Sequence, residues 1–513
     1  MEPACMSRLR SQNMFQASLI LVGAALFSRM TGFIREMVIA HRFGTSIDYD
    51  VFLVAVSIPI ALCNTLLFAL PSGLIPWYLS EKKRIERDVP SMFLAKAVLF
   101  FGVLLFLISL FILVLAPVIL RYYAPAFGEH EMYQGVFFLR MTSCIVFFGG
   151  LFALMRSFMH AENHFLVPAL APLLLNGAVI FFVLHLSGHA GIRALGWGVV
   201  AGYGLQAAVA FFFTVRHILR RSGPQTQSPV LHAAFQSVLF VLFIEVMGQM
   251  VVIIDRAFHG SVTTGSIAAL NFAGTLCQVP IGILGITLGT AIFPAISRMA
   301  VDGDYIELGR VVNTGMKTVL FVTLPVALFM MIFADPIIAL FFQRGAFTVE
   351  SKNLTAGAFV WLSFSVPFLA AHAVLIKTFY AMKIRHVLVL VTLGGLAGKV
   401  LLSHWLVIPF QHRGLAMATA LASSLLVICM LAFLQKKIRP FDIRVWASFL
   451  LRMVLTAMLA VLGARIGIYP YLGQKLYVAL PGSLLAAGII FIMLHVWMKT
   501  DALYFMIHRM RKT

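Results

Sequence analysis

The chain has 513 residues, of which 61% are hydrophobic and only 11% are charged, and its mean hydropathy is +0.97. A soluble globular protein carries roughly 25% charged and 45 to 50% apolar residues, so the composition excludes a soluble enzyme or binding domain. The formal net charge of +20 comes from short basic clusters between apolar runs, which favours contact with membrane lipids over nucleic acid.

The first apolar run, residues 14–27, contains no charged side chain and predicts a first membrane helix. Arg8 and Arg10 precede it as in a signal peptide, but no A-x-A cleavage site follows, so we expect an uncleaved helix. A bilayer-crossing helix needs about 20 mostly apolar residues, which predicts about fourteen spans and an all-α polytopic membrane protein. The predicted spans centre near Val22, Pro59, Phe106, Phe147, Leu174, Ala201, Phe243, Leu284, Val322, Phe368, Leu393, Leu421, Leu455 and Ile489.

Two of these spans are interrupted by helix-breaking residues. The second contains Pro59, Pro71 and Gly73, and the eighth contains Pro280 and Gly285. Such breaks are tolerated in a membrane where the freed backbone lines a cavity or packs on protein.

Lysine and arginine are distributed unevenly over the predicted loops. The N-terminus, the even-numbered loops and the C-terminus hold about 25 of them, against about 10 in the odd-numbered loops. The positive-inside rule therefore assigns both termini to the cytoplasm, which agrees with an even number of spans.

The sequence also contains an internal duplication. LPSGLIPWYLSEKKRIERD and the later FILVLAPVILRYYAPAF align with LGTAIFPAISRMAVDGDY and the later FMMIFADPIIALFFQRGAF, at an offset of roughly 220 residues. Because six spans return a chain to its starting side, the copies are parallel repeats, and we expect two six-helix lobes with a central cleft plus two extra C-terminal helices. The predicted domains are 1–218 (N-lobe), 219–231 (cytoplasmic linker), 232–437 (C-lobe) and 438–513 (two further spans and a basic tail).

The first predicted span carries ionisable residues where an apolar helix is expected. An ionisable group at mid-bilayer costs at least roughly 2.5 to 3.5 kcal/mol, so Arg29, Arg35 and Glu36 need partners or water. The two arginines lie roughly 120° apart on an ideal helix, and a bend at Gly32 would bring both toward one side. We interpret Arg29 and Arg35 as guanidinium groups that bind a phosphate-bearing substrate. The structural alternative is snorkelling to headgroups with an Arg35 to Glu36 interaction.

Other polar residues inside the spans are supporting candidates. Glu245 and Asp255 lie ten residues apart on the seventh span and are candidates for ion or proton coupling. Asp50 opens the second span, where a helix N-terminus favours a carboxylate. Lys399, on the eleventh span, would contact substrate or form a salt bridge. Asparagine and glutamine side chains in the spans are typical of interhelical hydrogen bonds, and these are Asn64, Asn176, Asn271 and Gln278.

No catalytic or metal-binding motif occurs. The sequence has no P-loop, HExxH or GxSxG, and its five cysteines (Cys5, Cys63, Cys144, Cys277, Cys429) are scattered without metal spacing, so we expect free, buried thiols. We therefore expect no enzyme activity, catalytic residue, metal site or cofactor. Energy would come from a monovalent cation or proton gradient, the membrane potential or the substrate's own gradient.

Two segments carry a family resemblance. SRMTGFIREMVIAHRFGTSIDYDVFLVA (residues 28–55) resembles the first-helix signature of the MurJ (MviN) lipid II flippases of the MOP transporter superfamily, and QVPIGILGITLGTAIFPAISRMAVDGD (residues 278–304) resembles their eighth-helix segment. The resemblance implies that Arg29 and Arg35 bind a pyrophosphate, with Ser28 and Asp50 also matching. Two cationic positions of the family are not matched, because its second-helix arginine pair aligns with Cys63 and Asn64, and its eighth-helix aspartate-arginine pair with Gly274 and Thr275.

The resemblance implies a flippase that moves an undecaprenyl-pyrophosphate-linked saccharide from the inner to the outer leaflet of the bacterial inner membrane by alternating access. The cargo would be lipid II or an exopolysaccharide or capsule repeat unit. We expect a monomer, with cell-envelope glycan synthesis proteins as possible associates, and no nucleic acid partner. The alternatives are a cation-coupled multidrug exporter of the same superfamily, in which Glu245 and Asp255 carry the coupling, and a membrane scaffold or glycan polymerase.

Overall fold

The structure is a computed structural model of the whole chain, and it describes residues 23, 27–85, 91–216, 231–438, 442–471 and 476–497. Every regular element in these ranges is a helix. The basic N-terminus, most of the first apolar run, most of the predicted linker 219–231 and the basic tail after residue 497 lie outside the described residues.

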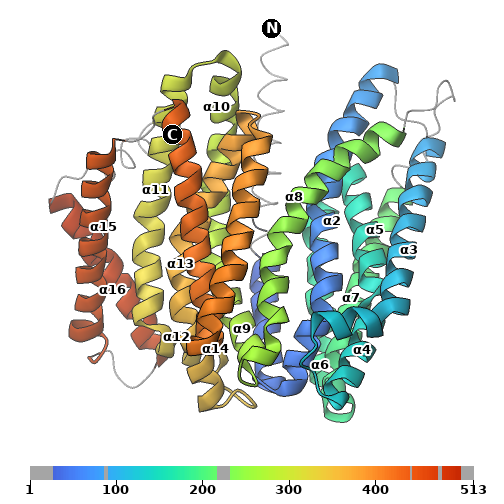
Figure 1. The fold of residues 1–513 in the computed structure, drawn as a ribbon, viewed down its shortest axis with the longest axis horizontal. Helices are drawn as coiled ribbons and strands as arrows, with labels where there is room; N and C mark the ends of the chain where they lie inside the picture. The colour runs from blue at the N-terminus through green and yellow to red at the C-terminus, as the bar shows by residue number, and fades with distance from the viewer. Residues whose placement is uncertain are drawn as a thin grey trace, which may run out of the picture. The chain divides into compact units, whose positions relative to one another are not determined.

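The helices form two compact units, Met1–Gly260 and Ser261–Thr513 (Figure 1). In the first unit a helical segment over 27–43 precedes seven labelled helices. These are α2 (Ile47–Ile85), α3 (Ser91–Tyr123), α4 (Glu129–Thr142), α5 (Cys144–Ala161), α6 (Leu166–Ala190), α7 (Arg193–Thr214) and α8 (Leu231–Ala257).

The second unit is built from eight labelled helices, some of which are interrupted. A π-helical turn over Ile281–Ile286, next to Pro280, joins α9 to α10, so the predicted break in the eighth span is confirmed. Phe321 of α11 packs with Met453 and Phe491, which places the two C-terminal helices against α11. The helices are α9 (Ser266–Pro280), α10 (Thr287–Asp302), α11 (Tyr305–Ile332), α12 (Ala334–Phe342), α13 (Val349–Ala381), α14 (Arg385–Ile438), α15 (Ile443–Gly463) and α16 (Leu476–Trp497).

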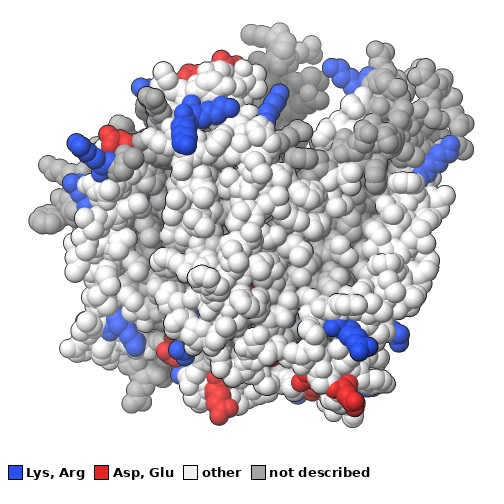
Figure 2. All heavy atoms as spheres, viewed as in Figure 1, with Lys and Arg blue, Asp and Glu red and all other residues white. Residues whose placement is uncertain are grey.

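Eleven helices in the described residues are long and apolar enough to cross a membrane. One of them, within α14, runs across a kink at Gln411, whose φ of 50° and ψ of −128° are not helical. An all-α protein with many apolar spans is therefore confirmed, whereas the count of fourteen stays a prediction. On the face drawn in Figure 2, charged side chains gather near the helix ends and leave an uncharged band between them.

The backbone repeats the duplication that the sequence predicts. The span Glu129–Ala161 and helix α13, Val349–Ala381, begin and end 220 residues apart. Asn163 and Lys383, also 220 residues apart, both have positive φ, 62° and 56°, in the turn that follows. The kink at Gln411 likewise corresponds to Gly191, with φ 57° and ψ −138°, which separates α6 from α7. Each half of α14 therefore matches one helix of the first copy.

Helix α8 belongs by its contacts to the first unit. It packs along α2, and a Cβ atom on Gly73 of α2 would lie 2.8 Å from the backbone of Val238 in α8. The contact boundary at Gly260 thus falls after α8, whereas the sequence places α8 at the start of the predicted C-lobe, 232–437. The predicted domain limits are drawn from the sequence repeat and not from contacts between helices, and they stay a prediction.

The four cysteines in the described residues are free. Cys63 and Cys277 are buried, as expected. Cys429 is exposed on α14, so the expectation of buried thiols is wrong at this position, where the helix presents apolar side chains outward.

Small residues bring α6 and α7 into close contact. Cβ atoms placed on Gly198 and Gly202 of α7 would lie 2.9 Å and 2.8 Å from the Cα atoms of Val179 and Leu175 in α6. Lipid removes the hydrophobic driving force between helices. Membrane helices therefore associate through close van der Waals packing, which small residues such as these glycines allow.

We expect Gly202→Ala to lower the stability of the first unit by about 1–3 kcal/mol, because the added methyl group meets backbone that cannot move cheaply. Gly204→Ala is the matched control, since its Cβ would meet only one ring atom, of Phe148, at 4.0 Å. Thermal unfolding of both variants in detergent checks this. Equal unfolding midpoints would contradict it.

Candidate functional site

The helical segment 27–43 carries a tightly paired arginine. Arg35 donates from Nη2 to Oε1 of Glu36 at 2.6 Å and from Nε to the same oxygen at 3.2 Å. The Glu36 side chain is 8% exposed and that of Arg35 is 28% exposed. The neighbouring carboxylate thus supplies the counter-charge that a guanidinium needs away from water.

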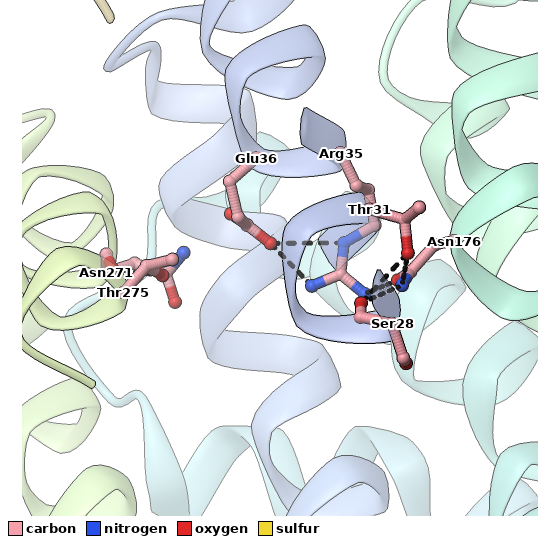
Figure 3. A network of polar contacts seen from close by, with 7 residues as sticks. All are labelled: Ser28, Thr31, Arg35, Glu36, Asn176, Asn271 and Thr275. Atoms are coloured by element: carbon pink, nitrogen blue, oxygen red, sulfur yellow. Dashed lines mark hydrogen bonds and ion pairs between the residues drawn. The ribbon is translucent and has the colours of Figure 1, made fainter. Parts of the chain in front are cut away.

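A second helix fixes the other side of the guanidinium. Arg35 donates from Nη1 to the side-chain oxygen of Asn176 on α6 at 3.1 Å (Figure 3). The Asn176 amide nitrogen donates to the Thr31 hydroxyl at 3.0 Å and to the Ser28 carbonyl at 3.2 Å. Asn176 is therefore an interhelical hydrogen bonder, as expected. Both its amide oxygen and its amide nitrogen form hydrogen bonds with the first helix.

Gly32 lies beside this network. A Cβ atom at Gly32 would lie 3.5 Å from the Asn176 amide nitrogen, which is an ordinary van der Waals contact. Residues 27–43 form one uninterrupted helix, and the bend at Gly32 stays a prediction.

Arg35 retains capacity for a further acceptor. A guanidinium has five N–H donors, and Arg35 uses one on each of its three nitrogens, which leaves two without an acceptor among the described residues. Because the side chain is also partly accessible, it can donate to a ligand oxygen while Glu36 and Asn176 hold it in place.

Arg29 differs from Arg35 in its surroundings. It is exposed, and no described residue accepts a hydrogen bond from it. Ser28, its neighbour, takes part in the network through its carbonyl group only.

Helix α8, the last helix of the first unit, makes polar contacts with α2. Arg256 donates from Nη1 to the Leu53 carbonyl at 2.7 Å, and the Asn64 amide lies 3.5 Å from Oε1 of Gln249. Asp50 is fully buried at the start of α2. Glu245 and Asp255 both lie on α8 and are partly buried, and their role in ion coupling stays a prediction.

The polar candidates of the second unit have their own partners. Lys399 is buried and donates to the Leu415 carbonyl at 2.9 Å and to the Thr419 hydroxyl at 2.6 Å. These bonds join the two halves of α14 across the kink, which favours a structural role for Lys399 over substrate contact. Asn271 accepts from the Thr275 hydroxyl through its carbonyl at 3.0 Å. In the described part of the chain, no group of three metal-ligating side chains occurs.

Comparison with known proteins identifies the family. The family model described as "Lipid II flippase MurJ" matches residues 39–479. The chain belongs to the lipid II flippase MurJ family. Lipid II flippase MurJ of Burkholderia cenocepacia is 26% identical over 83% of this chain and 84% of that protein, and a probable lipid II flippase MurJ of Buchnera aphidicola is 26% identical over 79% and 80%.

Solved structures share the fold. A structure of lipid II flippase MurJ in an inward closed conformation superposes with a TM-score of 0.79 at 20% identity, covering 94% of this chain and 99% of that one. An inward-facing multidrug resistance MATE transporter of the MOP superfamily gives a TM-score of 0.67 at 12% identity, covering 82% and 98%. This likeness confirms that the chain has the all-helical fold that MurJ and MATE structures share.

The positions that depart from the MurJ pattern carry uncharged residues in this chain. Cys63 is fully buried, and a Cβ atom on Gly149 of α5 would collide with its sulfur atom. Asn64 is near Gln249, and Gly274 of α9 has open space where a Cβ atom would lie. An arginine at position 63 would therefore have no room in this packing.

Sequence reasoning missed several residues that build the site. Thr31 and the pairing of Asn176 with Arg35 carry no sequence signal, because 141 residues separate the two partners. Arg156 on α5 was also missed, although an arginine inside a predicted span is the signal that drew attention to Arg29 and Arg35.

We expect Lys399→Met to lower the free energy of unfolding by about 1–3 kcal/mol, because the Leu415 carbonyl and the Thr419 hydroxyl lose a buried donor. Lys436→Met, at an exposed position of the same helix, is the control and should have little effect. Thermal unfolding in detergent measures both. A Lys399 variant as stable as the control would exclude the structural role.

Proposed function

We propose that this protein translocates a polyprenyl-pyrophosphate-linked saccharide, with lipid II as the cargo, across the bacterial inner membrane. Membership of the MurJ family supports the cargo. The observation that carries the proposal is Arg35, a membrane-embedded guanidinium held by Glu36 and Asn176 with two donors left for an anion.

The Arg35–Glu36 pair suits a transporter that must bind and release an anion. An unpaired guanidinium in this position would be costly in the empty protein, and Glu36 lowers that cost. A pyrophosphate presents several oxygens and more negative charge than one carboxylate, so it can take the two remaining N–H donors. The ligand need not displace Glu36, since the existing bonds and the new ones use different donors.

Arg29 provides a second contact in this proposal. It lies six residues before Arg35, about 9 Å along the helix axis, and its exposed side chain is free to move toward an anion. The first helix thus holds one fixed and one exposed guanidinium. The uncharged band of the protein would leave the prenyl chain in lipid.

The transport cycle would follow the alternating-access scheme of the superfamily. The chain folds as two compact units, which provides two bodies for such a motion. In this proposal Glu245 and Asp255 of α8 couple the motion to a monovalent cation or proton, both termini face the cytoplasm, and the protein acts as a monomer.

A multidrug exporter gains less support. Its likeness to this chain is one of fold, at 12% identity, whereas the family model and the sequence relatives are lipid II flippases. We therefore retain the lipid-linked saccharide as the cargo.

We expect Arg35→Ala to reduce export of lipid II about 10- to 100-fold, because charge-assisted hydrogen bonds contribute about 1.5–3 kcal/mol. Arg35→Lys keeps the charge but loses the fork, and should rescue only part of the activity. The measurement is rescue of growth, and of outer-leaflet lipid II, in cells depleted of their own flippase.

Arg42→Ala is the matched control, because Arg42 lies on the same helical segment, is exposed and, among the described residues, makes only a 3.4 Å contact with the Leu184 carbonyl. It should rescue growth fully. Full rescue by Arg35→Ala as well would refute the role of this arginine. Failure of the wild-type chain to rescue, with export of a different lipid-linked glycan, would refute lipid II as the cargo.

A further inference from the structure

Arg156 is an arginine of the first unit that lacks a counter-charge among the described residues. It lies on α5 between the buried residues Met155 and Ser157, and is itself partly buried. Its Nε atom is inaccessible and has no hydrogen-bond partner. Ser157 donates instead to the Ala153 carbonyl at 2.8 Å.

The carboxylate closest in sequence is engaged elsewhere. Oε1 of Glu162 accepts from Lys82 at 2.7 Å and from the Tyr78 hydroxyl at 2.7 Å. A guanidinium in an apolar bundle is costly without an anion, so its presence calls for a ligand that brings one.

The position of Arg156 relates it to the Arg35 network. Arg156 follows Gly149 by seven residues, which places both on one face of α5, with Arg156 about 10 Å further along the axis. A Cβ atom on Gly149 would lie 3.4 Å from the ring of Tyr203, and Tyr203 is within electrostatic range of Arg35. Arg156 thus lies about two turns beyond the contact of Gly149 with Tyr203, toward the end of α5 that the lysine and arginine distribution assigns to the cytoplasm.

A second basic side chain accompanies Arg156. His160 follows one turn later on α5 and is partly buried, and its ring centroid lies 5.2 Å from that of Phe165 in a tilted arrangement. Side chains four residues apart on a helix are neighbours, so the imidazole of His160 can donate a hydrogen bond to the same group that the Arg156 guanidinium contacts. A guanidinium fork beside an imidazole fits a phosphate group, which offers several oxygens in one place.

We propose that Arg156 and His160 bind the phosphate of a lipid headgroup, and that the pyrophosphate of the cargo contacts them before it reaches Arg35. The second part rests on the proposed function, because it takes the cargo from there. Phosphate binding by Arg156 does not depend on it. A phospholipid headgroup has the same chemistry, so the two sources must be separated by experiment.

The test uses the full-length protein in detergent and two probes, undecaprenyl pyrophosphate and phosphatidylglycerol, with retention measured by native mass spectrometry. Arg156→Gln should weaken binding of undecaprenyl pyrophosphate about tenfold or more, and Arg156→Lys should weaken it less. Arg140→Gln removes a charge from an exposed position of the same unit and should leave binding unchanged.

Thermal unfolding separates a binding role from a structural one. Because no described residue pairs with Arg156, Arg156→Gln should unfold at the wild-type temperature or above it. A lowered unfolding temperature together with unchanged retention of both probes would overturn the proposal, and unchanged retention alone would do the same.

The two lipid probes identify the source of the phosphate. Weaker retention of undecaprenyl pyrophosphate supports contact with the cargo, whether or not phosphatidylglycerol is affected. Weaker retention of phosphatidylglycerol alone would keep the phosphate site but overturn the contact with cargo. If Arg35→Ala leaves transport intact while Arg156→Gln still weakens binding, the role proposed for Arg35 fails and the Arg156 site stands.

Discussion

The structure depends on one constraint, which is that a charge carried into an apolar bundle needs a partner, either from the protein or from a ligand. Arg35 meets it through Glu36, the next residue, and through Asn176 on α6. Lys399 meets it with a carbonyl and a hydroxyl from the other half of its own hairpin. These two solutions differ in consequence. The first leaves donors for a ligand, whereas the second buries the ammonium and ties two helix halves together.

The sequence predicts the fold well because membrane helices are encoded locally. An apolar run of sufficient length specifies a span by itself, and the repeat reveals the plan of the bundle. The duplication even explains a feature that hydropathy cannot, namely that α14 is broken at Gln411. The first copy has Gly191 at the equivalent place, and the second adopts nearly the same backbone angles with a residue that disfavours them.

The site is only partly encoded in this way. A charge in an apolar run drew attention to Arg29, Arg35, Glu36 and Lys399, and the structure gives Arg35 and Lys399 different environments although both look alike in sequence. Their partners come from other helices or from across a kink, and hydrogen bonds between distant residues leave no periodic pattern. The packing of α8 along α2 could not be predicted either, because it depends on a close contact between Gly73 and Val238 that a hydropathy pattern does not show.

The departures from the family pattern are understandable in the same physical terms. Cys63 occupies a site between α2, α5 and α7 that is too tight for a long side chain, because Gly149 already closes on its sulfur atom. Charge that cannot be accommodated on α2 can be carried by another helix of the same unit, provided that a face with room exists. Helix α5 has such a face two turns beyond Gly149, where the partly buried Arg156 lies. An anion-binding surface can thus keep its charge while the helix that supplies the charge changes, because the anion responds to the position of the guanidinium group and not to the helix that carries it.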